Sequence, residues 1–215
     1  MRLLVLNPNT TVAVTQLLQR HVAAVVGEGV RIETATARFG AAYIADECSF
    51  AIGGHAAIDA YAAHVAAQGA PDAVLLGCFG DPGVWALREA SGRPVMGLAE
   101  AAMREAARLG RFAIVTGGLA WKPMLERLAR TLDLSERLAG VHAVAPTAAQ
   151  LAAHPAMGQA LLADACREAA VHADVVILGG AALAGMAMKL QPELRVRLID
   201  SVEAGARAIM AEMNS

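Results

Sequence analysis

Short apolar segments alternate with longer helix-like segments along this whole chain, and no other feature limits the possible folds as strongly. The short segments, which we expect to be strands, are residues 3–6, 31–35, 73–76, 94–97, 112–115, 141–144, 175–178 and 196–199. The expected helices are residues 10–26, 54–68, 84–90, 100–109, 122–132, 158–172 and 202–213. This alternation predicts an α/β fold in which right-handed βαβ units build parallel sheets flanked by helices.

Two pairs of segments resemble each other across the chain. Residues 72–78 read DAVLLGC and residues 174–180 read DVVILGG, while LVLN at residues 4–7 is matched by AIVT at 113–116. The pairs predict two pseudo-symmetric lobes, one formed by residues 1–96 plus 199–215 and the other by residues 97–198. The alternative is that no duplication occurred, because buried parallel strands are built from few residue types and resemble one another anyway.

Polar or glycine-rich loops follow four of the expected strands. In open parallel sheets, ligands bind beyond the carboxyl ends of the strands. If the two lobes face each other, these loops meet in one cleft, where we expect the active site. The loops are residues 7–11, 77–83, 116–118 and 179–180.

Cys78 is the residue in these loops whose side chain is best suited to catalysis. It directly follows an expected strand and precedes the expected helix 84–90. A helix N-terminus lowers the pKa of a nearby thiol, so we expect the pKa of Cys78 to be lowered toward neutrality and Cys78 to react with alkylating reagents before Cys48 or Cys166. The alternative is that Cys78 packs as a small buried hydrophobic residue.

The remaining loop residues are candidates for binding a substrate. Asn and Thr side chains can hold a carbonyl or carboxylate group, and glycines allow backbone N–H groups to turn inward as a nest for an oxyanion. Asn, Pro and Thr are also ordinary turn and cap residues, so a purely structural role stays open. The substrate-binding candidates are Asn7, Asn9, Thr10, Phe79, Gly80, Asp81, Thr116, Gly117, Gly179 and Gly180.

The composition argues against several other classes of protein. Hydrophobic residues make up 56% of the chain, the formal net charge is −2, and no run of Lys or Arg marks a nucleic-acid binder. No apolar stretch is long enough to span a membrane. Three separated cysteines and six histidines without paired spacing predict no disulfide framework and no metal site. Without signal-peptide anatomy, the chain is expected in the cytoplasm.

The loop motifs together resemble those of the aspartate/glutamate/hydantoin racemase superfamily, and most closely its hydantoin racemase branch. The resemblance rests on LNPNTT at residues 6–11, CFGDPG at 78–83, VMG at 95–97, Thr116 and LID at 198–200. It implies two pseudo-symmetric α/β lobes with the site between them, and cofactor-independent proton transfer at a carbon next to a carbonyl. In such enzymes one cysteine thiolate removes the proton from one face and a second thiol returns it to the other.

The chain departs from that family at the position of the second cysteine. Where the family has a motif resembling LGCAGM, residues 178–186 read LGGAALAGM, so Gly180 stands in place of the partner of Cys78. Three readings follow. The first is a hydantoin-type racemase or epimerase in which something else serves the opposite face. The second is a single-thiol decarboxylase or isomerase of the same superfamily, and the third is a non-catalytic ligand-binding relative.

The sequence says less about the substrate and the partners than about the fold. No arginine lies within the four loops, which argues against a second carboxylate on the substrate. We expect a small-molecule substrate, no nucleic acid, no membrane, and a homo-oligomer, which is the common state of such enzymes.

Overall fold

Residues 1–215, the whole chain, are described by a computed structural model. The N-terminal half forms a four-stranded parallel sheet in the order β2-β1-β3-β4. Its strands are β1 (Arg2–Asn7), β2 (Arg31–Thr36), β3 (Ala73–Leu76) and β4 (Val95–Gly97). The central strands β1 and β3 are almost entirely buried, as their continuous apolar sequences require.

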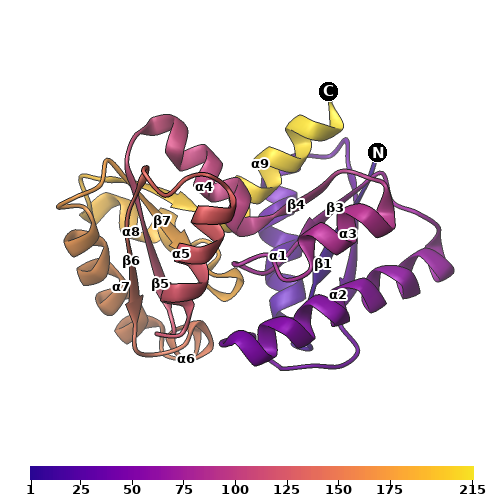
Figure 1. Cartoon of the computed structure of the whole chain (residues 1–215), viewed down its shortest axis with the longest axis horizontal. Coiled ribbons are helices and arrows are strands. Elements are labelled where there is room, and N and C mark those ends of the chain that lie inside the picture. The colour runs from indigo at the N-terminus through magenta and orange to yellow at the C-terminus, as the bar shows by residue number, and fades with distance from the viewer.

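The C-terminal half repeats this arrangement. Its four parallel strands lie in the order β6-β5-β7-β8, which is the same order counted from the start of each half. They are β5 (Phe112–Gly117), β6 (Leu138–Val144), β7 (Val175–Gly179) and β8 (Arg197–Asp200). The two sheets lie in separate halves of the molecule (Figure 1). The predicted fold class, two similar lobes that each contain a parallel sheet flanked by helices, is confirmed.

Helices cover the sheets and also tie the two halves together. Helix α4 follows β4 of the first sheet but packs against β7 of the second, whereas α9 follows β8 of the second sheet and packs against α1 and β3 of the first. The two helices also pack against each other, so each half is covered by a helix from the other. The helices are α1 (Val12–Val26), α2 (Glu47–Gln68), α3 (Val84–Ser91), α4 (Leu98–Leu109), α5 (Trp121–Thr131), α6 (Ala148–Ala153), α7 (Pro155–Ala169), α8 (Met186–Leu190) and α9 (Ser201–Met213), with 3₁₀ turns η1 (Ala181–Leu183) and η2 (Gln191–Glu193).

Strand register shows which positions of the two halves are equivalent. Leu6 pairs with Leu76 in the first sheet, and Val115 pairs with Leu178 in the second. Counting on from these pairs, Asn7 corresponds to Thr116 and Cys78 corresponds to Gly180. The two loops that follow β3 and β7 therefore occupy the same position in their respective sheets.

The two aspartates that precede β3 and β7 also have the same role. A carboxyl oxygen of Asp72 accepts a hydrogen bond from Arg2 N at 2.7 Å, and one of Asp174 accepts from Arg111 N at 2.8 Å. Arg2 and Arg111 stand at the beginning of β1 and just before β5. The similar segments seen in the sequence thus make the same contact at the amino end of each sheet.

Several helices differ from the sequence expectation. Helix α2 begins at Glu47 rather than residue 54, because the Asp46 side chain accepts from Ser49 N and the Ser49 hydroxyl accepts from Asp46 N. Helix α6 was not expected. It begins with a reciprocal cap of the same kind, between Thr147 and Gln150. The segment after Gly180 contains the short elements η1, α8 and η2, which are too brief to show helical periodicity.

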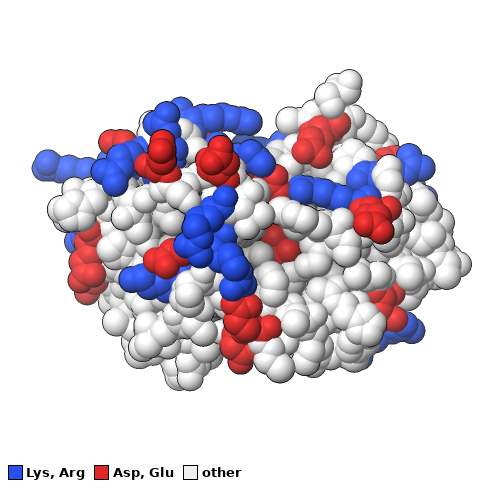
Figure 2. Space-filling view, in the orientation of Figure 1, with Lys and Arg blue, Asp and Glu red and all other residues white.

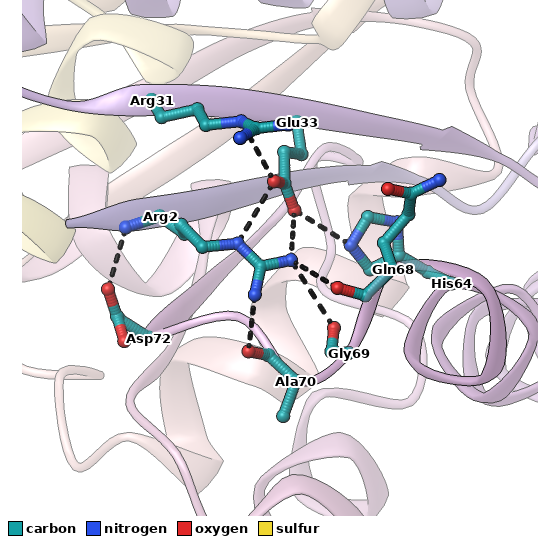
Figure 3. A network of polar contacts seen from close by, with 8 residues as sticks. All are labelled: Arg2, Arg31, Glu33, His64, Gln68, Gly69, Ala70 and Asp72. Atoms are coloured by element: carbon teal, nitrogen blue, oxygen red, sulfur yellow. Dashed lines mark hydrogen bonds and ion pairs between the residues drawn. The ribbon is translucent and has the colours of Figure 1, made fainter.

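A network of polar contacts fastens the amino end of the first sheet (Figure 3). The Arg2 guanidinium donates to both carboxyl oxygens of Glu33 at 2.9 and 3.0 Å and to carbonyl oxygens at the end of α2, including that of Gln68 at 2.8 Å. His64 Nε2 lies 3.0 Å from the same carboxyl group. The hydrogen bonds from Arg2 lower the pKa of Glu33. The network joins β1, β2 and α2 at the end of the sheet away from Cys78.

Charged side chains of both signs are interspersed on the face shown in Figure 2, and the lower part of that face carries few of them. Ion pairs in the molecule include that of Arg104 with Glu100 and that of Arg207 with Glu105. None of the helices combines the length and the apolar character that crossing a membrane requires.

Candidate active site

A cavity of about 50 Å³, the Cys78 cavity, lies where loops of both halves meet. Residues of the first half come from the loops after β1, β2 and β3 and from α1. Residues of the second half come from the end of β5 and from the regions after β5, β6 and β7. The lining residues are Asn9, Val14, Tyr43, Ile44, Cys78, Phe79, Thr116, Trp121, Ala148, Gly180, Ala181 and Ala182.

Five of the residues singled out in the sequence line this cavity: Asn9, Cys78, Phe79, Thr116 and Gly180. The other six are not among the lining residues: Asn7, Thr10, Gly80, Asp81, Gly117 and Gly179. Sequence reasoning missed Tyr43, Ile44 and Trp121, among others. Nothing in the local sequence marks Tyr43 or Ile44, whereas Trp121 could have been noticed as the first aromatic residue after the glycine loop at 117–118.

The N-terminal loop is held by hydrogen bonds among its own side chains. The Asn7 amide group donates to Asn9 Oδ1 and to Thr15 Oγ1, both at 3.0 Å, and Asn9 Oδ1 also accepts from Thr11 N at 2.9 Å. Asn7 is completely buried, so it supports the side chains of Asn9 and Thr15 and does not itself line the cavity. The Asn9 Nδ2 group donates to no atom of the chain, so it is the one amide group in this loop that can donate to a molecule in the cavity.

Backbone N–H groups without partners occur in equivalent positions on both sides of the cavity. The N–H groups of Phe79 and Gly80 donate to no atom of the chain, and neither do those of Ala181 and Ala182. Free N–H groups that point the same way form a nest for a developing oxyanion. Thr116 adds a hydroxyl group, which donates to the Gly179 carbonyl oxygen at 2.9 Å and keeps its acceptor capacity.

Asp81 holds the Cys78 loop in place and does not line the Cys78 cavity. Its carboxyl oxygens accept hydrogen bonds from Ala99 N at 2.9 Å and Glu100 N at 2.7 Å, at the start of α4. In the second half Asp200 makes the same kind of link, accepting from Gly185 N at 2.7 Å and from Val202 N at 2.9 Å at the start of α9. Each loop is therefore tied by a buried carboxyl group to the helix that crosses to the other half.

Gly117 and Gly179 are required by close packing. A Cβ atom on Gly179 would overlap the Phe79 ring, and one on Gly117 would lie 2.7 Å from Ala148 N. The backbone N–H of Thr10 donates to the Ala41 carbonyl oxygen at 3.1 Å, which holds the N-terminal loop against the loop that follows β2. These contacts bring the four loops close enough to share one cavity.

The expectation that a helix lowers the pKa of Cys78 is wrong. Burial raises the pKa of the thiol far above its ordinary value, and the neighbouring charge of Asp81 raises it further. Helix α3 begins only at Val84 with Gly83 as its N-cap, and the helix dipole acts over about one turn. Cys78 is 7% exposed, so desolvation outweighs the distant helix end and the resting side chain is a neutral thiol.

The wall across from the Cys78 loop offers no second thiol. Gly180 adopts φ 141°, a conformation that residues with a Cβ atom rarely take, and its N–H donates to Ser201 Oγ at 3.3 Å. Among the lining residues only Cys78 and Tyr43 carry ionisable side chains. The chain also has no cluster of three or more His, Cys, Asp or Glu side chains arranged to hold a metal ion.

The order in which the cysteines react with iodoacetamide at neutral pH tests the burial of Cys78. We expect Cys48 to be alkylated first, by about tenfold or more, because it is exposed whereas burial raises the pKa of Cys78 and raises that of Cys166 to about 12. This reverses the order expected from the sequence. Peptide mapping over time gives the order, and in a Cys48→Ser variant labelling should be slow throughout. Modification of Cys78 ahead of Cys48 would contradict the buried thiol.

The stability of an Asp81→Asn variant tests the link to α4. Burial raises the pKa of Asp81 to about 7, while the unfolded carboxyl titrates at about 4. Between these values the native state binds a proton that the unfolded state lacks, so this contribution to the free energy of unfolding falls as pH rises. We expect the substitution to cost about 1–3 kcal/mol near pH 5 and less near pH 8. Urea unfolding of both proteins measures the difference, and a cost that grows with pH would contradict this account.

Comparison with known proteins relates the whole chain to one family. The model of the family described as Asp/Glu/Hydantoin racemase matches residues 3–209. A hydantoin racemase from Paenarthrobacter aurescens is 34% identical over 212 residues, which cover 96% of this chain and 89% of the relative.

Solved structures give the same relationship. An allantoin racemase from Klebsiella pneumoniae superposes with a TM-score of 0.91 at 29% identity, covering 98% of this chain and 86% of the other. An allantoin racemase from Pseudomonas fluorescens superposes with a TM-score of 0.92 at 27% identity, covering 100% of this chain and 91% of the other.

Proposed function

We propose, from the premise that this chain belongs to the Asp/Glu/hydantoin racemase family, that it is a cofactor-independent racemase or epimerase acting on a hydantoin-type substrate. The observation that carries the proposal is the position of Cys78 in a cavity lined by residues of both halves, among them Phe79, Ala181 and Ala182, whose backbone N–H groups have no partner in the chain. The names of the relatives, hydantoin racemase and allantoin racemase, support this substrate class.

Cys78 is the proton-transfer group in this proposal. Because the resting side chain is a neutral thiol, its proton is first lost to water. The resulting thiolate takes the proton from the carbon next to a carbonyl, and the electron pair of the broken C–H bond moves toward the carbonyl oxygen. The resulting enolate oxygen accepts hydrogen bonds from the free N–H groups of Phe79 and Gly80 or of Ala181 and Ala182. Asn9 Nδ2 and Thr116 orient the ring, and the proton returns to carbon to complete the cycle.

Proton transfer on the face of the substrate opposite Cys78 is the distinctive part of the proposal. Gly180 stands where the family's second cysteine is expected, so proton return on that face uses water or another weak donor. Tyr43 is the other ionisable group in the lining. Racemisation should therefore be slower than a two-thiol enzyme would allow.

A single-thiol decarboxylase or isomerase is the second candidate. It is favoured by the pKa of Cys78, which burial raises, because a neutral thiol is better suited to donating a proton than to removing one. In that reaction the loss of carbon dioxide creates the enolate, and Cys78 delivers a proton to one face.

The two candidates are distinguished by incubating the protein with one enantiomer of a 5-substituted hydantoin and, separately, with a disubstituted malonate. Loss of optical rotation from the hydantoin at constant concentration supports the racemase. Release of carbon dioxide from the malonate with no change in the hydantoin supports the decarboxylase instead. Inactivity toward both would remove the proposed function.

We further propose that the protein works in the cytoplasm on a small molecule, without nucleic acid and as a homo-oligomer. The three unpaired cysteines support a reducing compartment.

A further inference from the structure

The Cys78 cavity is too small to hold a substrate together with a bulky substituent. Its volume is about 50 Å³, whereas pockets for small molecules are typically about 300–1,000 Å³. A second cavity, here called the side cavity, has a volume of about 100 Å³. It is lined by Phe50, Gly80, Trp121, Met124, Arg127, Leu128 and Thr131. Trp121 belongs to both linings, so its indole ring is the wall that the two cavities share.

The position of Trp121 depends on glycines in loops of both halves. The edge of the indole lies against Gly80, where a Cβ atom would overlap the ring, and its Cδ1 atom lies 3.4 Å from the Cβ position of Gly118. The ring of Phe50 on α2 stacks edge-on at 6.4 Å between centroids. The indole is thus held by contacts rather than by a hydrogen bond, since its N–H group has no partner in the chain.

The side cavity is suited to an apolar group. Phe50, Met124 and Leu128 supply aromatic and aliphatic surface. Its one charged side chain, Arg127, is already paired: the guanidinium donates to both carboxyl oxygens of Glu47 at 2.6 and 3.0 Å, which joins α5 to the start of α2. A substituent entering the side cavity therefore meets mainly apolar side chains and an arginine whose charge is already paired with that of Glu47.

We propose that the side cavity receives the substituent of the reacting carbon and that Trp121 sets the size of substituent accepted. The inference rests on the proposed function and deepens it, because it names the substrate class as hydantoins with a bulky apolar or aromatic 5-substituent. When such a substrate binds, the indole is displaced and the two cavities become one. A 5-methyl group needs only the Cys78 cavity, so it does not use the side cavity.

Filling the side cavity with a larger side chain tests this assignment. In a Leu128→Trp variant, the ratio of kcat/KM for 5-benzylhydantoin to that for 5-methylhydantoin should fall about tenfold or more, since the benzyl group loses its place. Trp121→Ala should raise the same ratio. The matched control is Leu109→Trp, which makes the same substitution at an exposed position at the end of α4 and should leave the ratio unchanged. Equal ratios in Leu128→Trp and Leu109→Trp would overturn the inference.

Tryptophan fluorescence tests binding without requiring turnover. The chain has two tryptophans, and Trp85 is half exposed on α3, so a Trp85→Phe variant leaves Trp121 as the only reporter. Titration with 5-benzylhydantoin should change its emission, and a second substitution, Leu128→Phe, should weaken that change. 5-Methylhydantoin leaves the indole in place and should change the emission less than 5-benzylhydantoin does.

The two measurements separate this inference from the proposed function. An emission change with 5-benzylhydantoin but no turnover of either hydantoin would remove the proposed function and leave the side cavity as a binding site. Turnover of both hydantoins with no response of Trp121 to the benzyl compound would remove the side cavity and leave the function. The fluorescence result decides even if Leu128→Trp fails to fold.

Discussion

Replacing Cys78 with alanine should lower the rate of hydantoin racemisation by about a hundred- to ten-thousand-fold, the range that a positioned acid–base group contributes. The reason is that no other ionisable group in the cavity lining except Tyr43 could take its place. Cys78→Ser should be almost as inactive, because a hydroxyl group is a far weaker acid than a thiol. Polarimetry on one pure enantiomer measures the loss.

The matched control is Cys48→Ser, a change at an exposed cysteine at the start of α2. It should leave the rate within about twofold, as expected for a surface change away from the site. Far-UV circular dichroism on all three variants shows that the fold is retained. Activity in Cys78→Ala close to that of the native chain would rule out the thiol as the proton-transfer group.

Introducing a thiol in place of Gly180 should raise the rate of inversion by up to about a hundredfold, the lower end of the range for an acid–base group. A Cβ atom there would lie 3.3 Å from Leu183 Cδ1, a tight contact that the flexible Leu183 side chain must relieve by a small shift, and 3.7 Å from Ala148 Cβ. The backbone opposes it, because φ is 141° at Gly180 and the loop must relax. Gly180→Cys should therefore be less stable as well as faster.

Gly180→Ala separates these two effects, since it brings the same backbone strain without a thiol. It should lose stability and gain no inversion. Ala181→Cys is a second way to place a thiol in the lining without a change at a positive-φ glycine. If neither cysteine variant inverts substrate faster than the native chain, the absence of a thiol at Gly180 is not what limits proton transfer on the face of the substrate opposite Cys78.

The central strands of the two sheets were predictable from the sequence because each central strand is buried on both sides. Burial makes its residues continuously apolar, as in residues 73–76 and 175–178, and the Asp and Gly at their ends mark where each strand begins and stops. The reciprocal caps at Asp46 and Thr147 were also readable, since each has its partner three residues later. They would have corrected the start of α2 and revealed α6.

The composition of the cavity was less predictable, because it depends on contacts between distant segments. Tyr43 and Ile44 reach the Cys78 cavity from a loop with no sequence motif, and Trp121 reaches it from the other half. The pKa of Cys78 was misjudged for a similar reason. Proximity to a helix is visible in a sequence, whereas the packing that buries the thiol and the approach of Asp81 are not.

The central claim is that one thiol, Cys78, moves the proton at a carbon next to a carbonyl. The most direct measurement combines NMR of the C5 proton in D₂O, which follows exchange, with optical rotation, which follows inversion, starting separately from each pure enantiomer of 5-benzylhydantoin. The account predicts that the native chain exchanges this proton with retention in one enantiomer, that inversion and exchange from the other enantiomer are much slower, and that Cys78→Ala abolishes the fast exchange. Fast and equal inversion of both enantiomers, or exchange that persists in Cys78→Ala, would contradict it.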